Sequence, residues 1–289
     1  MISLAISTFL LQWATGGLAF LWITTRRREV SIGYGWLLRI TYGLIALAAL
    51  VVGLKYGTSI VRELSSAGVV LACGAVGCVS WDRRRAGVKL QRERAAARSA
   101  RVAAMTGVDT GIARAEQQFD SEADEFPPNL DLIAPAIGLL GLIAGAIDAG
   151  GPVWLSIART LVGAAFLGAV SDGMLLGHWY LTQPGLPREP LIELVKWVGL
   201  IWPFEVALLL VPVGMVSALN GTIDDGYNGM LGWFWVACAV TTIVLVVVTR
   251  MALRERYYSA VMAATGLLYL AILTAFGTDL VARAILSMA

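Results

Sequence analysis

Residues 229–249, GMLGWFWVACAVTTIVLVVVT, contain no acidic, basic or histidine side chain. A run of about 20 mainly apolar residues is long enough, as a helix, to cross the hydrocarbon core of a bilayer. The stretch therefore predicts a membrane-spanning α-helix. It lies in a chain with further runs of the same kind, so the fold depends on how many of them there are.

The apolar runs account for most of the chain. Its 289 residues are 58% apolar and only 15% charged, whereas soluble domains are roughly half apolar and a quarter charged. We therefore expect an all-α, polytopic membrane bundle of about eight transmembrane helices. The candidate spans lie at about residues 2–24, 34–54, 65–81, 132–149, 153–180, 191–219, 229–249 and 257–282.

The first run is expected to remain in the membrane. It is apolar from Ile2, and the arginines Arg26–Arg28 follow it, whereas a cleaved signal peptide carries its basic residues before the apolar segment. The three cysteines all lie inside apolar runs without CxxC spacing, which favours a packing role for them.

The distribution of basic residues predicts the orientation. Lys and Arg accumulate in the cytoplasmic loops of membrane proteins. If the sides alternate, the loops after the first, third, fifth and seventh spans hold nearly all the basic residues outside the spans. The opposite side holds only Lys55, Arg62 and Arg283. We expect both termini outside and a multi-pass protein of a bacterial inner membrane.

Three regions follow from this topology. Residues 1–81 form a first membrane region of three spans, 82–130 a cytoplasmic loop, and 131–289 a second region of five spans. The loop is basic at first and then acidic. Its basic segment, residues 83–101, is either a solvated helix or a surface for anionic lipid or a partner protein. A net charge of +2 is too small to indicate a nucleic-acid partner.

Several ionisable residues fall inside the candidate spans, where they usually face the interior of a bundle or a cavity. Depths taken from the rise of a helix allow two pairs between the fifth and sixth spans. One is Arg159 with Glu205, for which Asp148 is an alternative partner of the arginine. The other is Asp172 with Lys196. The remaining candidates are Arg39 and Glu193.

These pairs either fix the register of the helices or mark a polar pathway. Glu205 is the strongest candidate for binding or proton transfer, because it lies in IWPFEVALLLVP between Pro203 and Pro212. Prolines free backbone carbonyls, and such broken geometry is tolerated where it meets protein or water. A buried glutamic acid can carry a proton or bind a polar ligand.

His178 is the only histidine in the chain. It follows Pro152 by 26 residues, further than a bilayer core requires, and Trp179 and Tyr180 come directly after it. We therefore expect an interfacial position, with lining of an inner-facing site or ligation of a cofactor as alternatives. A bis-histidine haem needs a second histidine, a His/Met haem has no supporting feature, and no zinc ligand set is present. The sequence predicts no metal and specifies no cofactor.

The sequence does not identify the activity. It lacks HExxH, GxSxG, Walker A and dinucleotide-binding patterns. Three classes remain open, in this order: a non-catalytic subunit or scaffold of a membrane complex, with quinone or proton chemistry as its candidate link; a secondary transporter of a small solute; and an intramembrane enzyme. The candidate binding or proton-path residues are Glu205, Arg159, Asp172, Lys196 and His178.

Overall fold

The computed structural model describes residues 5–86, 124–183, 186–211, 214–255 and 257–288, and helix is the only regular secondary structure among them. The all-α prediction is confirmed. The elements are α1 (Ile6–Thr25), α2 (Ile32–Tyr56), α3 (Ile60–Asp82), η1 (Arg83–Arg85), η2 (Pro128–Leu132), α5 (Ile133–Asp148), α6 (Val153–Thr182), α7 (Glu189–Leu210), α8 (Gly214–Leu219), α9 (Met230–Ala252) and α10 (Tyr258–Met288).

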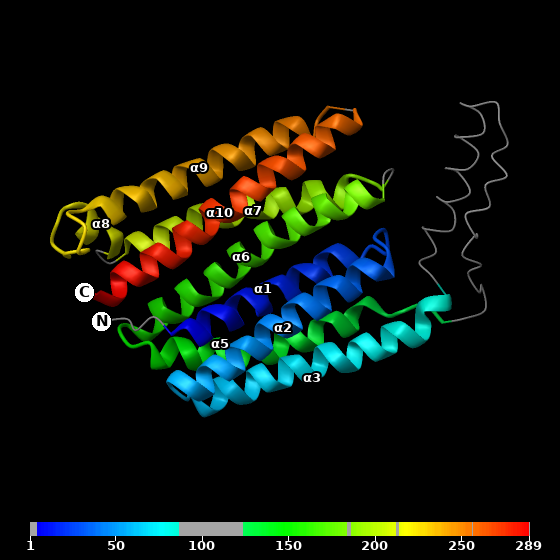
Figure 1. Ribbon diagram of the computed structural model, residues 1–289, viewed down its shortest axis with the longest axis horizontal. Coiled ribbons are helices and arrows are strands. Elements are labelled where there is room, and N and C mark those ends of the chain that lie inside the picture. Colours follow the sequence, from blue (N-terminus) through cyan, green and yellow to red (C-terminus); the bar gives the residue numbers. More distant parts are fainter. Residues whose placement is uncertain (1–4, 87–123, 184–185, 212–213, 256, 289) are drawn as a thin grey trace.

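Seven of the described helices are long and apolar enough to cross a membrane: α1, α2, α3, α5, α6, α9 and α10. The chain is thus an integral, multi-pass membrane protein, as predicted. The helix α7 is not among the seven, because its 22 residues include Glu193, Lys196 and Glu205. It nevertheless packs between α6 and α9 and runs along the same direction as they do (Figure 1).

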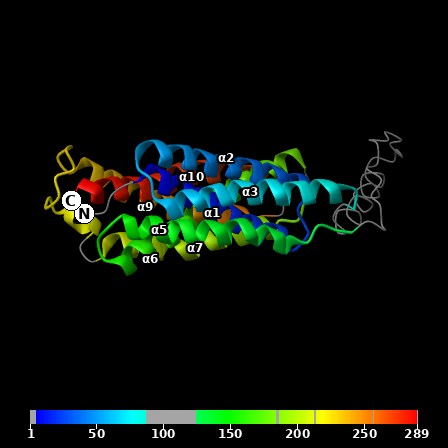
Figure 2. The same cartoon turned by 90° about the horizontal axis from the view of Figure 1, so that it is seen from below.

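The long helices lie side by side in one elongated bundle (Figures 1 and 2). The beginning of α1 and the end of α10 lie at the same end, called here the terminal end. The end of α3 and the beginning of α5 lie at the other, called here the loop end. Most of the predicted loop 82–130 falls outside the described residues, and the orientation of the bundle across the membrane stays a prediction.

The helices α1 and α6 occupy the centre of the bundle. The helix α1 packs against α2, α5 and α6, while α6 also contacts α7 and α10. Their backbones approach closely at glycines: a Cβ added to Gly16 would lie 1.8 Å from the carbonyl oxygen of Ala164, and one added to Gly168 would lie 2.2 Å from the carbonyl carbon of Gly16. Small residues permit such approach between membrane helices, where packing rather than water exclusion drives association.

The predicted span 191–219 is wrong as a single helix. The helix α7 ends at Leu210, Val211 is extended with φ −89° and ψ 146°, and α8 begins at Gly214. The cause is local, because Val211 precedes Pro212, and a proline disfavours the helical conformation of the residue before it. Pro203, in contrast, is accommodated inside α7.

The third helix begins five residues earlier than the predicted span and so includes Arg62 and Glu63. Glu63 accepts a hydrogen bond from the Ser59 N–H at 2.8 Å, which satisfies a donor at the start of α3. Arg62 forms a buried ion pair with Glu63 at 2.6 Å. This mutual neutralisation explains how two charged residues extend an apolar helix.

Candidate functional site

Five polar side chains from four helices meet inside the bundle toward the terminal end. They are Gln12 of α1, Arg159 of α6, Glu205 of α7, and Asp279 and Arg283 of α10, called here the polar cluster. Gln12, Glu205 and Asp279 are fully buried, and Arg159 is 5% exposed. With two guanidinium groups and two carboxyl groups, the cluster can be electrically neutral when all four are ionised.

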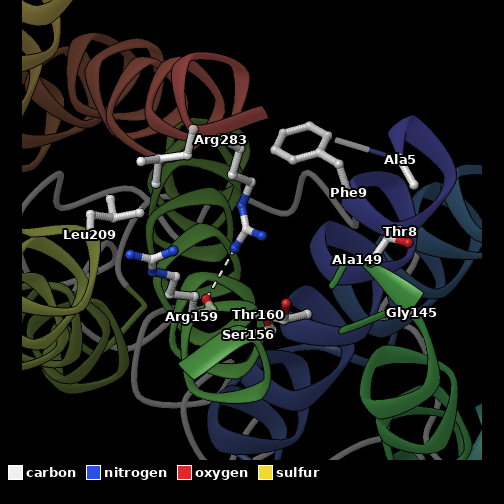
Figure 3. A pocket seen from close by; sticks show the side chains of 11 residues that line it. Ala5, Thr8, Phe9, Gly145, Ala149, Ser156, Arg159, Thr160, Leu209 and Arg283 are labelled. Atoms are coloured by element: carbon white, nitrogen blue, oxygen red, sulfur yellow. Dashed lines mark hydrogen bonds between the residues drawn. The ribbon is translucent and has the colours of Figure 1, made fainter. Parts of the chain in front are cut away.

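Hydrogen bonds around Asp279 and Arg283 join α1, α6 and α10. The Arg283 Nε donates to both carboxylate oxygens of Asp279, at 2.8 and 2.9 Å, across one turn of α10. Gln12 Nε2 donates to Asp279 Oδ2 at 3.2 Å. Arg283 also donates from a terminal nitrogen to the backbone carbonyl of Arg159 at 3.0 Å, the contact drawn as a dashed line in Figure 3.

Arg159 caps the broken end of α7. Its Nε donates to the Leu208 carbonyl at 2.9 Å, and a terminal nitrogen donates to the Val211 carbonyl. Carbonyls at a helix end have no partner within the helix and need one in an apolar environment. The break after Leu210 exposes these acceptors, and the arginine satisfies them.

This capping replaces the predicted ion pairs of Arg159. Within the described residues, its guanidinium forms no ion pair with Glu205 or with the alternative partner Asp148, which is exposed at the end of α5. Arg159 still interacts electrostatically with the carboxyl group of Glu205 inside the polar cluster. The predicted depths place both residues in one cluster, but Arg159 donates its hydrogen bonds to backbone carbonyls rather than to Glu205.

Glu205 differs from the other buried charged groups. Neither of its carboxyl oxygens meets an N–H or hydroxyl donor in the described part of the chain. Its carboxyl group interacts electrostatically with that of Asp279 and with the guanidinium groups of Arg283 and Arg159. Two neighbouring carboxylates repel each other, and a buried charge without a donor is costly. The pair is therefore suited to holding a proton.

A small cavity of about 30 Å³ adjoins the cluster (Figure 3). Its polar lining comes from Arg159 and Arg283 and from the hydroxyls of Thr8, Ser156 and Thr160. A cavity of this size can hold about one water molecule.

The small cavity shares residues with a larger one at the terminal end. Ala5, Gly145 and Ala149 line both. The larger cavity measures about 1090 Å³, lies between the beginning of α1, the α2–α3 connection and the end of α5, and is lined by Arg62 and Asp148 among others. A recess thus extends from the end of the bundle toward the cluster.

Asp172 belongs to a second buried group. Tyr42 donates its hydroxyl to Asp172 Oδ1 at 2.5 Å, and Tyr34 donates to the Asp172 backbone carbonyl at 3.3 Å. The remaining oxygen, Oδ2, has no donor among the residues described. The predicted pair with Lys196 is not formed, because Asp172 faces α2 whereas Lys196 is on the exposed side of α7.

His178 lies apart from these hydrogen-bond networks. It is exposed near the end of α6, and its Nδ1 lies 3.1 Å from the hydroxyl of Tyr269 on α10. The rings meet edge to face at 6.3 Å. No three His, Cys, Asp or Glu side chains are placed to hold a metal ion anywhere in the described ranges.

The remaining candidates form ion pairs near the loop end. Arg39 and Asp131 pair at 2.8 and 3.0 Å through two parallel hydrogen bonds, both side chains being almost fully buried. Glu193 pairs with Arg26 and Arg27, so it lies at the end of the bundle rather than inside it.

Sequence reasoning missed Gln12 and Asp279 and placed Arg283 outside the spans. The signal that could have found two of them is DLVAR, residues 279–283, in which an acidic and a basic residue stand four apart within an apolar run. Comparison of the chain with family models, curated proteins and solved structures found no match.

Proposed function

We propose that the chain is a proton-coupled secondary transporter of a small solute, with the Glu205–Asp279 carboxyl pair as its proton-binding site. The observation that carries the proposal is the fully buried Glu205 carboxyl, which lies beside Asp279 and meets no N–H or hydroxyl donor within the described residues. The protein would act in the inner membrane of a bacterium with residues 82–130 cytoplasmic, as the basic loops predict.

The contrast with Arg39–Asp131 supports a functional reading of Glu205. That ion pair is buried, bidentate and further bonded to Thr25 and Ser80, as expected of charges that fix helix packing. Glu205 has no comparable set of donors in the structure as described. Keeping an incompletely paired ionisable group inside a membrane is costly, and such groups mark ion and substrate pathways.

The interruption of α7 also supports transport. Discontinuous helices form the binding sites of many secondary transporters, and the break in α7 lies toward the terminal end, next to the polar cluster. Here Glu205 lies in α7 just before the break, and Arg159 binds the carbonyls at the break. Movement of the arginine toward an anionic solute would free these carbonyls and couple the solute to α7.

The lining of the small cavity suggests the class of solute. Two guanidinium groups and three hydroxyls suit a small molecule that carries a carboxylate or a similar anion. Uptake of such an anion together with one proton on the carboxyl pair is electrically neutral. Because the cavity itself holds about one water, the solute would enter from the larger recess as the helices separate.

A proton-linked, non-catalytic subunit of a membrane complex is the second candidate. It is favoured by Asp172, a second buried carboxylate with an oxygen lacking a donor within the described ranges. Asp172 and Arg159 are 13 residues apart on α6, or about 20 Å along the helix. Asp172 and the carboxyl groups of the polar cluster, at two depths of the bundle, could pass protons to a partner without any solute.

Flux through the purified chain in liposomes distinguishes the two. A pH-sensitive dye inside the vesicles would report proton entry driven by gradients of small carboxylates. We expect flux with at least one of them, lost in Glu205→Gln and kept in Glu189→Gln, which removes an exposed carboxylate from the same helix. Equal flux in both variants contradicts the proposal. Absence of flux from the lone chain, with a stoichiometric partner in native membranes, favours the subunit.

A further inference from the structure

The loop-end halves of α2 and α3 enclose an open groove of about 540 Å³. Its walls are almost entirely apolar, and Ile40, Leu44 and Leu71 beside it are more than half exposed on the outside of the bundle. We propose that this groove binds one acyl chain of a membrane phospholipid, with the phosphate of that lipid at the arginines of η1. The proposal is independent of the transport function.

Missing side chains create the groove. A Cβ added to Gly74 or Gly77 of α3 would meet no atom within 4 Å, so these glycines do not serve close packing inside the chain. On the α2 side, a Cβ added to Gly43 would meet Cys73 at 3.4 Å, an ordinary contact. The hollow therefore faces the membrane, where lipid is the surrounding material.

The length of the groove matches one leaflet. Along α3 it runs from Val70 to Trp81, 11 residues or about 16 Å, close to half of a hydrocarbon core of about 30 Å. Trp36 and Trp81, whose rings lie 5.0 Å apart, line its loop-end mouth. Tryptophan prefers the membrane interface, so the mouth is expected at headgroup level. A partner helix would cross both leaflets, whereas an acyl chain spans only one.

The charges at the mouth suit a phosphate. The guanidinium of Arg84 lies over the Trp81 ring, 4.4 Å from its centre, and Arg85 is exposed next to it. Asp82 also lines the mouth, so an amino headgroup would meet a carboxylate as well. The arginines of η1 begin the basic segment 83–101. In the proposed complex the groove holds the acyl chain, and these arginines bind the phosphate at its mouth.

Photolabelling of the full chain in nanodiscs tests the proposal. The probe is a phospholipid with a diazirine in the middle of one acyl chain, used with a phosphatidylglycerol and with a phosphatidylethanolamine headgroup. We expect labelling concentrated on residues 36–47 and 70–81, and saturable by unlabelled phospholipid in detergent. Even labelling of all exposed helices, without saturation, would mean ordinary surrounding lipid and overturn the proposal.

Variants sharpen the test. In Gly74→Leu/Gly77→Leu two side chains fill the groove, and labelling there should fall about tenfold, which corresponds to about 1.4 kcal/mol. The matched control is Gly266→Leu on α10, where an added Cβ also meets nothing within 4 Å. Arg84→Gln/Arg85→Gln should weaken labelling by the phosphatidylglycerol probe. Unchanged labelling in the groove-filling variant contradicts the proposal, and if that variant does not fold, Gly77→Leu alone and the saturation of the wild-type chain decide.

Discussion

Arg283 holds Asp279 through two hydrogen bonds to its carboxylate oxygens, at 2.8 and 2.9 Å, so the two carboxyl groups of the polar cluster are unequal. Asp279 is fixed by Arg283 and Gln12. The adjacent Glu205 meets no N–H or hydroxyl donor in the portion of the chain described. Because of this asymmetry, the proposed function assigns the gain and loss of a proton to Glu205.

Removal of one partner of Asp279–Arg283 should destabilise the bundle strongly. Asp279→Asn leaves the guanidinium without its counter-charge, a change that costs about 3–5 kcal/mol for buried pairs. The double variant Asp279→Asn/Arg283→Gln should recover part of this loss. Thermal unfolding in detergent, followed by size-exclusion fluorescence, measures both. Strictly additive losses would show that the two side chains do not interact.

Exchange of the charges at positions 159 and 205 should not rescue stability. Arg159 donates to the carbonyls of Leu208 and Val211, and a glutamate at that position could accept but not donate. Arg159→Glu/Glu205→Arg should therefore be at least as unstable as Arg159→Gln. Recovery of wild-type stability in the exchanged protein would instead support a direct ion pair.

Enlargement of Gly16 should disrupt the contact between α1 and α6. A Cβ there would overlap the Ala164 carbonyl oxygen at 1.8 Å, and backbone cannot move aside as a flexible side chain can. We expect Gly16→Val to cost more than the roughly 1–3 kcal/mol typical of overpacked cores. Gly266→Val, at an open position on α10, is the control, and similar melting temperatures for the two variants would contradict this packing.

The connection before α9 should be sensitive to acid. Burial acts to raise the pKa of Asp225. Its carboxylate also accepts hydrogen bonds from the backbone N–H groups of Gly229, Tyr227 and Leu231, and these bonds lower the pKa on balance. A pKa lowered by folding stabilises the loop above the unfolded value of about 3.9, and this contribution is lost as the pH falls through the folded value.

Hydrogen exchange of residues 220–231 checks this expectation. Exchange should be slow near neutral pH and should rise, after correction for intrinsic rates, as Asp225 becomes protonated. Asp225→Asn should show fast exchange already at neutral pH, whereas Asp224→Asn should change it less, because Asp224 accepts only the Gly226 N–H among the bonds described. The same protection in Asp225→Asn as in the wild type would contradict the role of the carboxylate.

The helices could be predicted because an apolar run of spanning length is a local property of the sequence. The predicted helix bounds were wrong where a neighbouring residue or an ion pair changes the local preference for helix. Pro212 ends α7 through its effect on Val211, and the Arg62–Glu63 pair extends α3 beyond the apolar run. The end of α7 could have been predicted from the proline, but the start of α3 depends on a charge pair.

The members of the site were partly predictable, but their partners were not. Glu205, Arg159 and Asp172 were identified because charges are conspicuous in apolar runs. The rise of a helix gives the depth of a residue but not the direction it faces. Asp172 therefore bonds Tyr42 of α2 rather than Lys196, and Arg159 binds backbone carbonyls that appear only once α7 is interrupted.

The most direct test of the central claim is infrared difference spectroscopy of the purified chain in lipid while the pH is changed. A protonated carboxyl group has a carbonyl band that a carboxylate lacks. We predict such a band from the Glu205–Asp279 pair, lost in Glu205→Gln, retained in Glu189→Gln, and shifted when a transported solute binds. An identical band in wild type and Glu205→Gln would show that Glu205 carries no proton and would contradict the proposed function.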